Sequence, residues 1–486
     1  MGRSLYWPNP NIEIAQGATS RLAGGEMTET AVPAVGLRKH PKGMPVLFMT
    51  EMWERFSFYS MRAIFALYMI TPPEYGGLGF SAVVTAQIYG LYVGIVYLTT
   101  LMGGYLADRI FGIKRSIIIG GLFMTAGHFL LGMIMLAHFY EGLSPLPFFF
   151  AGLICLVLGN GLFKPNISTM LGNLYREVPE KKDDGYNIFY MGINLGAFLS
   201  PLVAAYLRGL HPIYGWHFAF SAAGFGMIIS MATFLSFQKY VAAGDILPAS
   251  KRKKDPELAK KTKVDAGDPV KNKQRTMALL LVFVIVIFFW MAFEQQGLTL
   301  TFWAQNATNS TLLPETFQAI NPMFILLLTF PIVTFWGTMR RKGKEPSTAA
   351  KMVLGMLFTA FAYAILAVAA FSGGNTGHVN VMWLVVAYAA ITTGELMLSP
   401  LGLSLVSKLA PPGRLGLMMG GWFVAAGIGG YLSGTVGILW TKIDHSTFFL
   451  ILVASSTIIA LVLVSLLKWL NPIIHEAEAE AEAESV

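Results

Sequence analysis

Long apolar segments recur along the whole chain and alternate with short polar stretches. Twelve of these segments are long enough to cross the roughly 30 Å hydrocarbon core of a bilayer as helices. The first six are expected at 44–70, 82–107, 114–137, 146–170, 185–207 and 216–238, and the second six at 276–298, 315–339, 348–372, 379–407, 415–440 and 446–470. The pattern therefore predicts an all-α polytopic membrane protein with twelve transmembrane helices.

Polar segments flank and divide the apolar ones. Scattered Gly, Pro and polar residues at the start predict a mobile segment, and the alternation of Glu and Ala at the end predicts a solvated acidic tail. The expected units are a mobile cytoplasmic N-terminal segment at 1–43, a six-helix half at 44–238, a basic cytoplasmic linker at 239–275, a six-helix half at 276–470 and an acidic cytoplasmic tail at 471–486.

The loops that carry Lys and Arg set the expected orientation, because basic loops stay on the cytoplasmic side. The even-numbered connections hold most of these residues: Arg109, Lys114, Arg115, Lys181, Lys182, the run from Lys251 to Lys254, Arg340, Arg341, Lys342, Lys344, Lys408 and Arg414. The odd-numbered connections hold little beyond Arg208 and Lys442. Even connections and both termini are therefore expected in the cytoplasm. A basic loop recurs after the second helix of each half, which favours two halves related by an axis along the membrane normal.

Composition excludes several classes of function. The chain is 55% hydrophobic and only 13% charged, whereas ordinary soluble domains contain about 25% charged residues. The basic pI of about 9.3 comes from short loops and one linker, so nucleic-acid binding is not expected. The single cysteine, Cys155, excludes an intrachain disulfide. No span contains a zinc-binding HExxH pattern or a GxSxG nucleophile turn, so neither an enzyme nor a metal or organic cofactor is expected.

The first apolar segment contains charged side chains at membrane depth. At about 100° per residue, one helical face carries them, with Tyr59 at its edge. The residues on this face are Glu51, Glu54, Arg55, Phe58 and Arg62. Four ionised groups facing lipid would cost on the order of 10 kcal/mol, so the face is expected to look onto protein or water. The alternatives are a structural ion-pair network and a substrate or ion path, and intramembrane charge favours the path.

Other spans also carry polar or aromatic groups that suit a cavity. These are Tyr97, Lys164, Asn194, Trp290, Glu294, Asn321, Glu395 and Trp422. The first half contributes the bases and the second half contributes two acids. Ion pairs between the halves could hold one mouth of a cavity shut, and protonation of an acid would release its partner. The residues alone therefore predict a proton-coupled secondary transporter.

Three motifs resemble those of a known family. Glu51-x-x-Glu54-Arg55-Phe56, followed by Tyr59, resembles the ExxERF motif of the proton-dependent oligopeptide transporter family. The segment from Phe189 to Gly196 resembles that family's second signature. The loop at 103–115 is similar to the corresponding loop of the wider major facilitator superfamily. The resemblance runs in order from the first helix to the twelfth and implies the major facilitator fold.

The resemblance also implies an activity, namely proton-driven uptake of di- and tripeptides by alternating access. It implies gate ion pairs on the outer side, Arg62 with Glu294 and Lys164 with Glu395. Glu294 would be the proton-sensitive switch, with Glu51 and Glu54 also taking part in coupling. The implied substrate contacts are Arg55, Lys164 and Tyr59 for the peptide carboxylate, Glu395 with Asn194 and Asn321 for the amine, and Tyr97, Trp290 and Trp422 for the side chains.

Two departures from the family pattern qualify these expectations. The family often has two tyrosines after the motif, and Phe58 stands in place of the first, so one hydroxyl is missing. The linker is polar and too short for the two extra helices that many bacterial members carry, so twelve helices are expected. The expected protein is a multi-pass, monomeric transporter of the cytoplasmic (inner) membrane. The alternative cargo is nitrate, another organic anion or a drug, but an anion carrier has no use for an acid such as Glu395 facing its substrate.

Overall fold

The computed structural model describes most of the chain as one compact unit. The described residues are 40–140, 142–178, 181–245, 268–375, 377–411 and 414–484. Almost all of the expected mobile N-terminal segment (1–43) and the basic run from Lys251 to Lys254 lie outside these residues.

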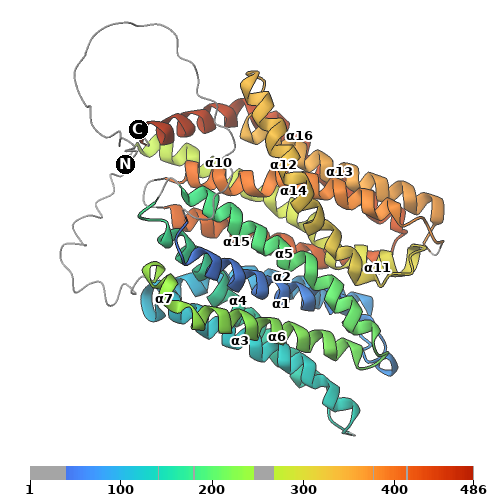
Figure 1. The fold of residues 1–486 in the computed structure, drawn as a ribbon. Coiled ribbons are helices and arrows are strands. Elements are labelled where there is room, and N and C mark those ends of the chain that lie inside the picture. Colours follow the sequence, from blue (N-terminus) through green and yellow to red (C-terminus); the bar gives the residue numbers. More distant parts are fainter. Residues whose placement is uncertain are drawn as a thin grey trace, which may run out of the picture. The chain divides into compact units, whose positions relative to one another are not determined.

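Six long helices form the N-terminal half (Figure 1). They are α1 (Met44–Ile70), α2 (Ala82–Leu106), α3 (Ile113–Met133), α4 (Leu146–Leu174), α5 (Lys182–Gly209) and α6 (Gly215–Ser236). Shorter turns extend or follow them: η2 (Pro73–Tyr75), η3 (Ala107–Phe111), η4 (Ile134–His138), α7 (Gln238–Val241) and η6 (Ala242–Gly244). Within this half α1 packs against α5 and α6, and α3 packs against α4 and α6. The charged helix is thus enclosed by its neighbours.

The C-terminal half also consists of long helices, and η7 divides its first span into α10 and α11 (Figure 1). Its helices are α10 (Pro269–Phe293), α11 (Thr299–Ala307), α12 (Ile320–Arg341), α13 (Thr348–Gly373), α14 (Met382–Leu409), α15 (Leu415–Gly437) and α16 (His445–Glu484). The tighter turns η7 (Glu294–Gly297), η8 (Pro314–Ala319) and η9 (Ile438–Thr441) lie between or beside them. In the described chain, eleven helical stretches are long and apolar enough to cross a membrane. The twelfth is α1, whose four charges lower its hydropathy.

Two helices in this half extend beyond the limits that the sequence predicts for the linker and the last span. The linker was expected to reach residue 275, but α10 begins at Pro269. The Asp268 side chain accepts a 2.8 Å hydrogen bond from the Val270 amide, and Pro269 suits the first helical position, so this start is well capped. The last span was expected to end near residue 470, but α16 continues as a helix to Glu484. Glu and Ala are strong helix formers, which explains the extension into the acidic tail.

The tail also has partners that the sequence left open. Lys271 Nζ lies 2.5 Å from Glu476 Oε1, and Arg275 pairs with Glu480. These pairs join the start of α10 to the end of α16. Bonding to Arg275 lowers the pKa of Glu480 below its usual value.

The two halves meet most closely along α2 and α15. A Cβ atom added at Gly90 would lie 2.8 Å from both the Gly434 Cα atom and the Tyr431 carbonyl oxygen. Such separations are shorter than van der Waals contact, so only glycine allows the two backbones to approach this closely. On the N-terminal side α5 also contacts η8 and α12 of the other half.

Gly90→Ala is expected to push α2 and α15 apart and to lower the free energy of unfolding by about 1–3 kcal/mol, the usual cost of overpacking. The measurement is the thermal unfolding midpoint of the purified protein in detergent. The control is Gly104→Ala on the same helix, because a Cβ atom there would have nothing within 4 Å. Equal midpoints for the two variants would contradict the close approach.

Candidate substrate cavity

A cavity of about 320 Å³ lies between the two halves. Its size falls at the lower end of the range typical of small-molecule sites. Side chains from both halves line it, and all ten residues expected to contact substrate are among them. These are Arg55, Tyr59, Arg62, Tyr97, Lys164, Asn194, Trp290, Asn321, Glu395 and Trp422.

The charges of α1 are arranged around Arg55. Its Nε atom lies 3.2 Å from Glu51 Oε1, and its Nη2 atom donates a 2.7 Å hydrogen bond to Glu54 Oε1. All three side chains are buried. The guanidinium carbon also lies 5.2 Å from the centre of the Phe58 ring. One arginine therefore pairs with two carboxylates and packs against an aromatic ring.

The part of α1 that lines the cavity is narrower than the face predicted to carry the charges of this helix. Glu51, Arg55, Tyr59 and Arg62 line the cavity, whereas Glu54 and Phe58 do not. At about 100° per residue the four lining positions span an arc of about 80° that is rotated toward Tyr59. Glu54 and Phe58 fall on the other side of that arc and contact protein, which is one of the two surroundings that the sequence predicts for this face. Glu54 takes part only through its bond to Arg55.

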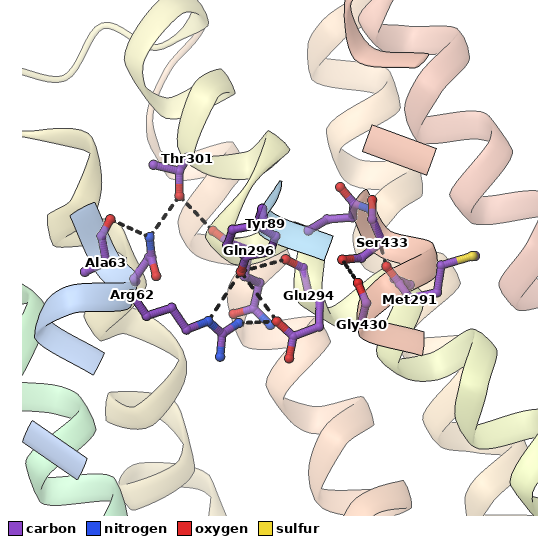
Figure 2. Close-up of polar contacts among 12 residues, drawn as sticks. Arg62, Ala63, Tyr89, Met291, Glu294, Gln296, Thr301, Gly430 and Ser433 are labelled. Carbon is purple, nitrogen blue, oxygen red and sulfur yellow. Dashed lines mark hydrogen bonds and ion pairs between the residues drawn. The ribbon is translucent and has the colours of Figure 1, made fainter. Parts of the chain in front are cut away.

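A polar contact between the halves joins α1 to η7 (Figure 2). Arg62 Nη2 forms an ion pair with Glu294 Oε2, and Arg62 Nε donates a 3.3 Å hydrogen bond to the Tyr89 hydroxyl. That hydroxyl in turn lies 3.5 Å from both the carbonyl oxygen and Oε2 of Glu294. The structure thus places Arg62 against the residue with which it was expected to pair. Gly297 makes this arrangement possible, because a side chain there would collide with the Tyr89 hydroxyl.

A hydrogen-bonded network holds η7 in place (Figure 2). Gln295 Nε2 donates to the Ser433 carbonyl oxygen at 2.9 Å, which ties η7 to α15. The Thr301 hydroxyl donates to the Gln296 carbonyl oxygen at 2.8 Å and accepts from Gln318 Nε2 at 3.0 Å. Glu294 is therefore held by a turn whose own backbone is fixed from two sides.

The second expected gate pair is not formed. Among the described residues no ion pair joins Lys164 to Glu395. Lys164 Nζ instead lies 4.8 Å from the centre of the Tyr97 ring, and Glu395 Oε2 accepts a 2.8 Å hydrogen bond from Asn321 Nδ2. The two charges line the cavity from opposite halves, and each has a partner in its own half. This conformation therefore corrects the expected pairing.

Several polar residues at the site were missed by the sequence reasoning. Tyr89 lies about two helical turns before Tyr97, and this spacing could have placed it near the same face. Gln318 donates a 3.0 Å hydrogen bond to the Ala63 carbonyl oxygen, and a backbone partner leaves no trace in a sequence. Tyr190 and Ser399 are recognisable in the sequence as polar groups of two other spans; they also line the cavity, although no substrate contact was predicted for them.

Comparison with known proteins identifies relatives over most of the chain. A family model described as POT family matches residues 114–253 and 239–456. The peptide transporter YePEPT of Yersinia enterocolitica is 32% identical over 466 residues, which cover 82% of this chain and 88% of that protein. A di-/tripeptide transporter of Lactococcus lactis subsp. cremoris is 30% identical over 488 residues, which cover 88% and 95%.

Solved structures agree with this assignment. A mutant peptide transporter POT in complex with alafosfalin matches with a TM-score of 0.78 at 29% identity, covering 90% of this chain and 96% of that one. The same kind of mutant in complex with sulfate matches with a TM-score of 0.79 at 29% identity and the same coverage. These matches confirm the all-α membrane fold of the major facilitator type. The sequence motifs, the cavity and the family match together show that the chain belongs to the POT family, the proton-dependent oligopeptide transporters.

Proposed function

We propose that this protein is a proton-coupled symporter that imports di- and tripeptides across the cytoplasmic (inner) membrane by alternating access, with a single chain as the functional unit. The observation that carries the proposal is the charge distribution of the cavity. Arg55 and Lys164 line it from the N-terminal half, and Glu395 lines it from the C-terminal half. The relatives named as peptide transporters support the same activity. The family is one of transporters, so the protein is not an enzyme.

The cavity chemistry suits the ends of a short peptide. A free peptide has a carboxylate at one end and an ammonium at the other, and charge-assisted hydrogen bonds to these groups are the strong ones. Arg55, Lys164 and the Tyr59 hydroxyl would hold the carboxylate, while Glu395, oriented by Asn321, would hold the amine. Trp290, Trp422 and neighbouring apolar groups would accept varied side chains, because apolar pockets discriminate weakly among them.

Proton coupling would act through the pair between Arg62 and Glu294. Glu294 Oε1 is buried and has no hydrogen-bond partner in the described chain, so this oxygen could receive a proton. Protonation removes the negative charge that attracts Arg62 and weakens the contact between the halves. A substrate or proton shifts the equilibrium only as far as it binds one state more tightly than the other. Proton and peptide binding would thus jointly select the state that opens.

An anion carrier fits the same cavity less well. Glu395 faces the cavity, and a carboxylate there would repel nitrate or another anion at short range. Its hydrogen bond from Asn321 fixes it in that position. The peptide therefore remains the cargo that the charges favour.

Purified protein in proteoliposomes is expected to take up protons when a dipeptide is added outside. Glu294→Gln is expected to lose proton-driven accumulation of dipeptide and to retain counterflow exchange, because its cavity still binds peptide but its gate no longer carries the titrating charge. The control is Glu476→Gln, which breaks an exposed ion pair within one half. Normal proton-driven accumulation by Glu294→Gln would refute the coupling assignment.

The role of Glu395 is tested with two ligands that differ only at the amine. Wild-type protein is expected to bind alanyl-alanine more tightly than N-acetyl-alanyl-alanine in a competition assay. Glu395→Gln should reduce that preference by on the order of tenfold, since a hydrogen bond between charged groups contributes about 1.5–3 kcal/mol. The acetylated peptide serves as the internal control because it has no ammonium group to lose. An unchanged preference in Glu395→Gln would show that another group binds the amine.

A further inference from the structure

A second ion pair joins the halves at the end of the bundle that is predicted to be the outer one. Arg208 lies in the last turn of α5, and Glu315 lies in η8 of the other half. Arg208 Nη1 donates to both Oε1 and Oε2 of Glu315 at 3.1 Å. The Glu315 side chain is 0% exposed and that of Arg208 only 17% exposed. In the sequence Arg208 is a basic residue of an odd-numbered connection, and nothing there indicates Glu315 as its partner.

The N-terminal half holds Arg208 in position independently of Glu315. Its guanidinium carbon lies 4.1 Å from the centre of the Trp216 ring on α6. Trp216 Nε1 in turn donates a 2.9 Å hydrogen bond to the Tyr75 carbonyl oxygen in the connection between α1 and α2. A cation over an aromatic ring is attracted by its π system. When the halves separate, Arg208 therefore keeps this support and loses only its carboxylate partner.

The short helix η8 carries Glu315 together with other contacts that matter to the cavity. A 3₁₀ helix has three residues per turn, so Glu315 and Gln318 lie on the same side of η8. Gln318 donates to the carbonyl oxygen of Ala63, the residue after Arg62 on α1. Asn321, three residues further on, binds Glu395 in the cavity. One continuous segment thus connects the rim of the bundle, the first helix and the carboxylate expected to hold the peptide amine.

The hydrogen bonds and ion pairs described between the halves lie toward this same end. They are Arg62 with Glu294, Tyr89 with Glu294, Gln318 with Ala63, and Arg208 with Glu315. The structure therefore represents the state in which the predicted outer side is closed. To admit substrate from that side, the halves must separate here, and separation would expose both members of the rim pair to water.

We propose that Arg208 and Glu315 form a second outer gate, which breaks whenever the transporter opens outward and closes together with the pair between Arg62 and Glu294. Because η8 leads directly to Asn321, opening of this gate is coupled to the positions of Asn321 and Glu395. The inference rests on the proposed function in one respect, which is that the outward opening admits peptide. An ion pair that stays formed in every state would contribute only to the free energy of unfolding. An ion pair that breaks on opening also sets the equilibrium between the closed and open states.

The first test measures conformation and needs no peptide. Nitroxide labels are placed by Glu74→Cys and Lys442→Cys, exposed loop positions from opposite halves at this end, in a Cys155→Ser background. Double electron–electron resonance in lipid nanodiscs then gives the distance distribution. Glu315→Gln and Arg208→Gln should each increase the long-distance population several-fold, and the double swap Arg208→Glu with Glu315→Arg should restore part of the short one. Glu476→Gln, the matched same-half control, should leave the distribution unchanged.

A Glu315→Gln distribution identical to that of the Glu476→Gln control would overturn the proposal. A second measurement does not depend on the stability of these charge variants. Gly209 and Leu313 are neighbours across the same contact, since a Cβ atom at Gly209 would lie 3.5 Å from Leu313 Cδ1. Gly209→Cys with Leu313→Cys, bridged by a short reducible thiol cross-linker, should abolish dipeptide counterflow, and reduction should restore it.

Unchanged counterflow in the cross-linked protein would also overturn the proposal, because the rim would then not need to open. The two measurements separate this inference from the proposed function. A shifted distance distribution in a protein that transports no peptide would support the gate and refute the cargo. Normal peptide transport with no shift would refute the gate and leave the cargo intact.

Discussion

The ionised side chains of α1 can lie at membrane depth only because other protein groups pair with them. An isolated charge at the bilayer centre costs roughly 2.5–3.5 kcal/mol even on lenient scales. Arg55 binds Glu51 and Glu54, and Arg62 binds Glu294 of the other half. These pairings require that α1 be enclosed by α5 and α6 and that its open face meet the C-terminal half. The ion pairs that allow the charged helix α1 to lie in a membrane therefore also join the two halves.

The two halves also place different charges in the cavity. The N-terminal half contributes three bases, Arg55, Arg62 and Lys164, and one acid, Glu51, whereas the C-terminal half contributes Glu395. No ion pair joins Lys164 to Glu395 among the described residues. A zwitterion placed between the halves could satisfy both sides at once. The closed end, which is predicted to be the outer one, and the separated charges of the cavity thus belong to one arrangement, in which substrate can replace a missing contact between the halves.

The sequence predicted most of the fold because membrane helices depend on local properties. The expected limits of the first span, 44–70, coincide with α1, and all ten expected substrate contacts line the cavity. The errors arise where local pattern is insufficient. The expected pair of Lys164 with Glu395 is absent because each charge contacts a group of its own half, Tyr97 and Asn321 respectively. The Glu and Ala residues of the tail favour the continuation of α16, but no periodic pattern indicates its partners Lys271 and Arg275.

Contacts between residues far apart in the chain were the least predictable. Tyr89 bridges Arg62 and Glu294 only because Gly297 leaves room for its hydroxyl. Gln318 binds a backbone oxygen, and the partners Arg208 and Glu315 come from different halves. Each residue taken alone is an ordinary polar group of a helix. Their pairing follows from the three-dimensional arrangement of the halves, which hydropathy and charge counts do not specify.

In the proposed symport, movement of peptide is thermodynamically tied to movement of protons. The most direct test is the peptide gradient at which net flux across proteoliposomes vanishes, measured under imposed pH gradients with the membrane potential clamped at zero. For each proton carried with a peptide, this balance point should shift by about tenfold in concentration ratio per pH unit. A balance point that stays at equal peptide concentrations on both sides, whatever the pH gradient, would contradict the account.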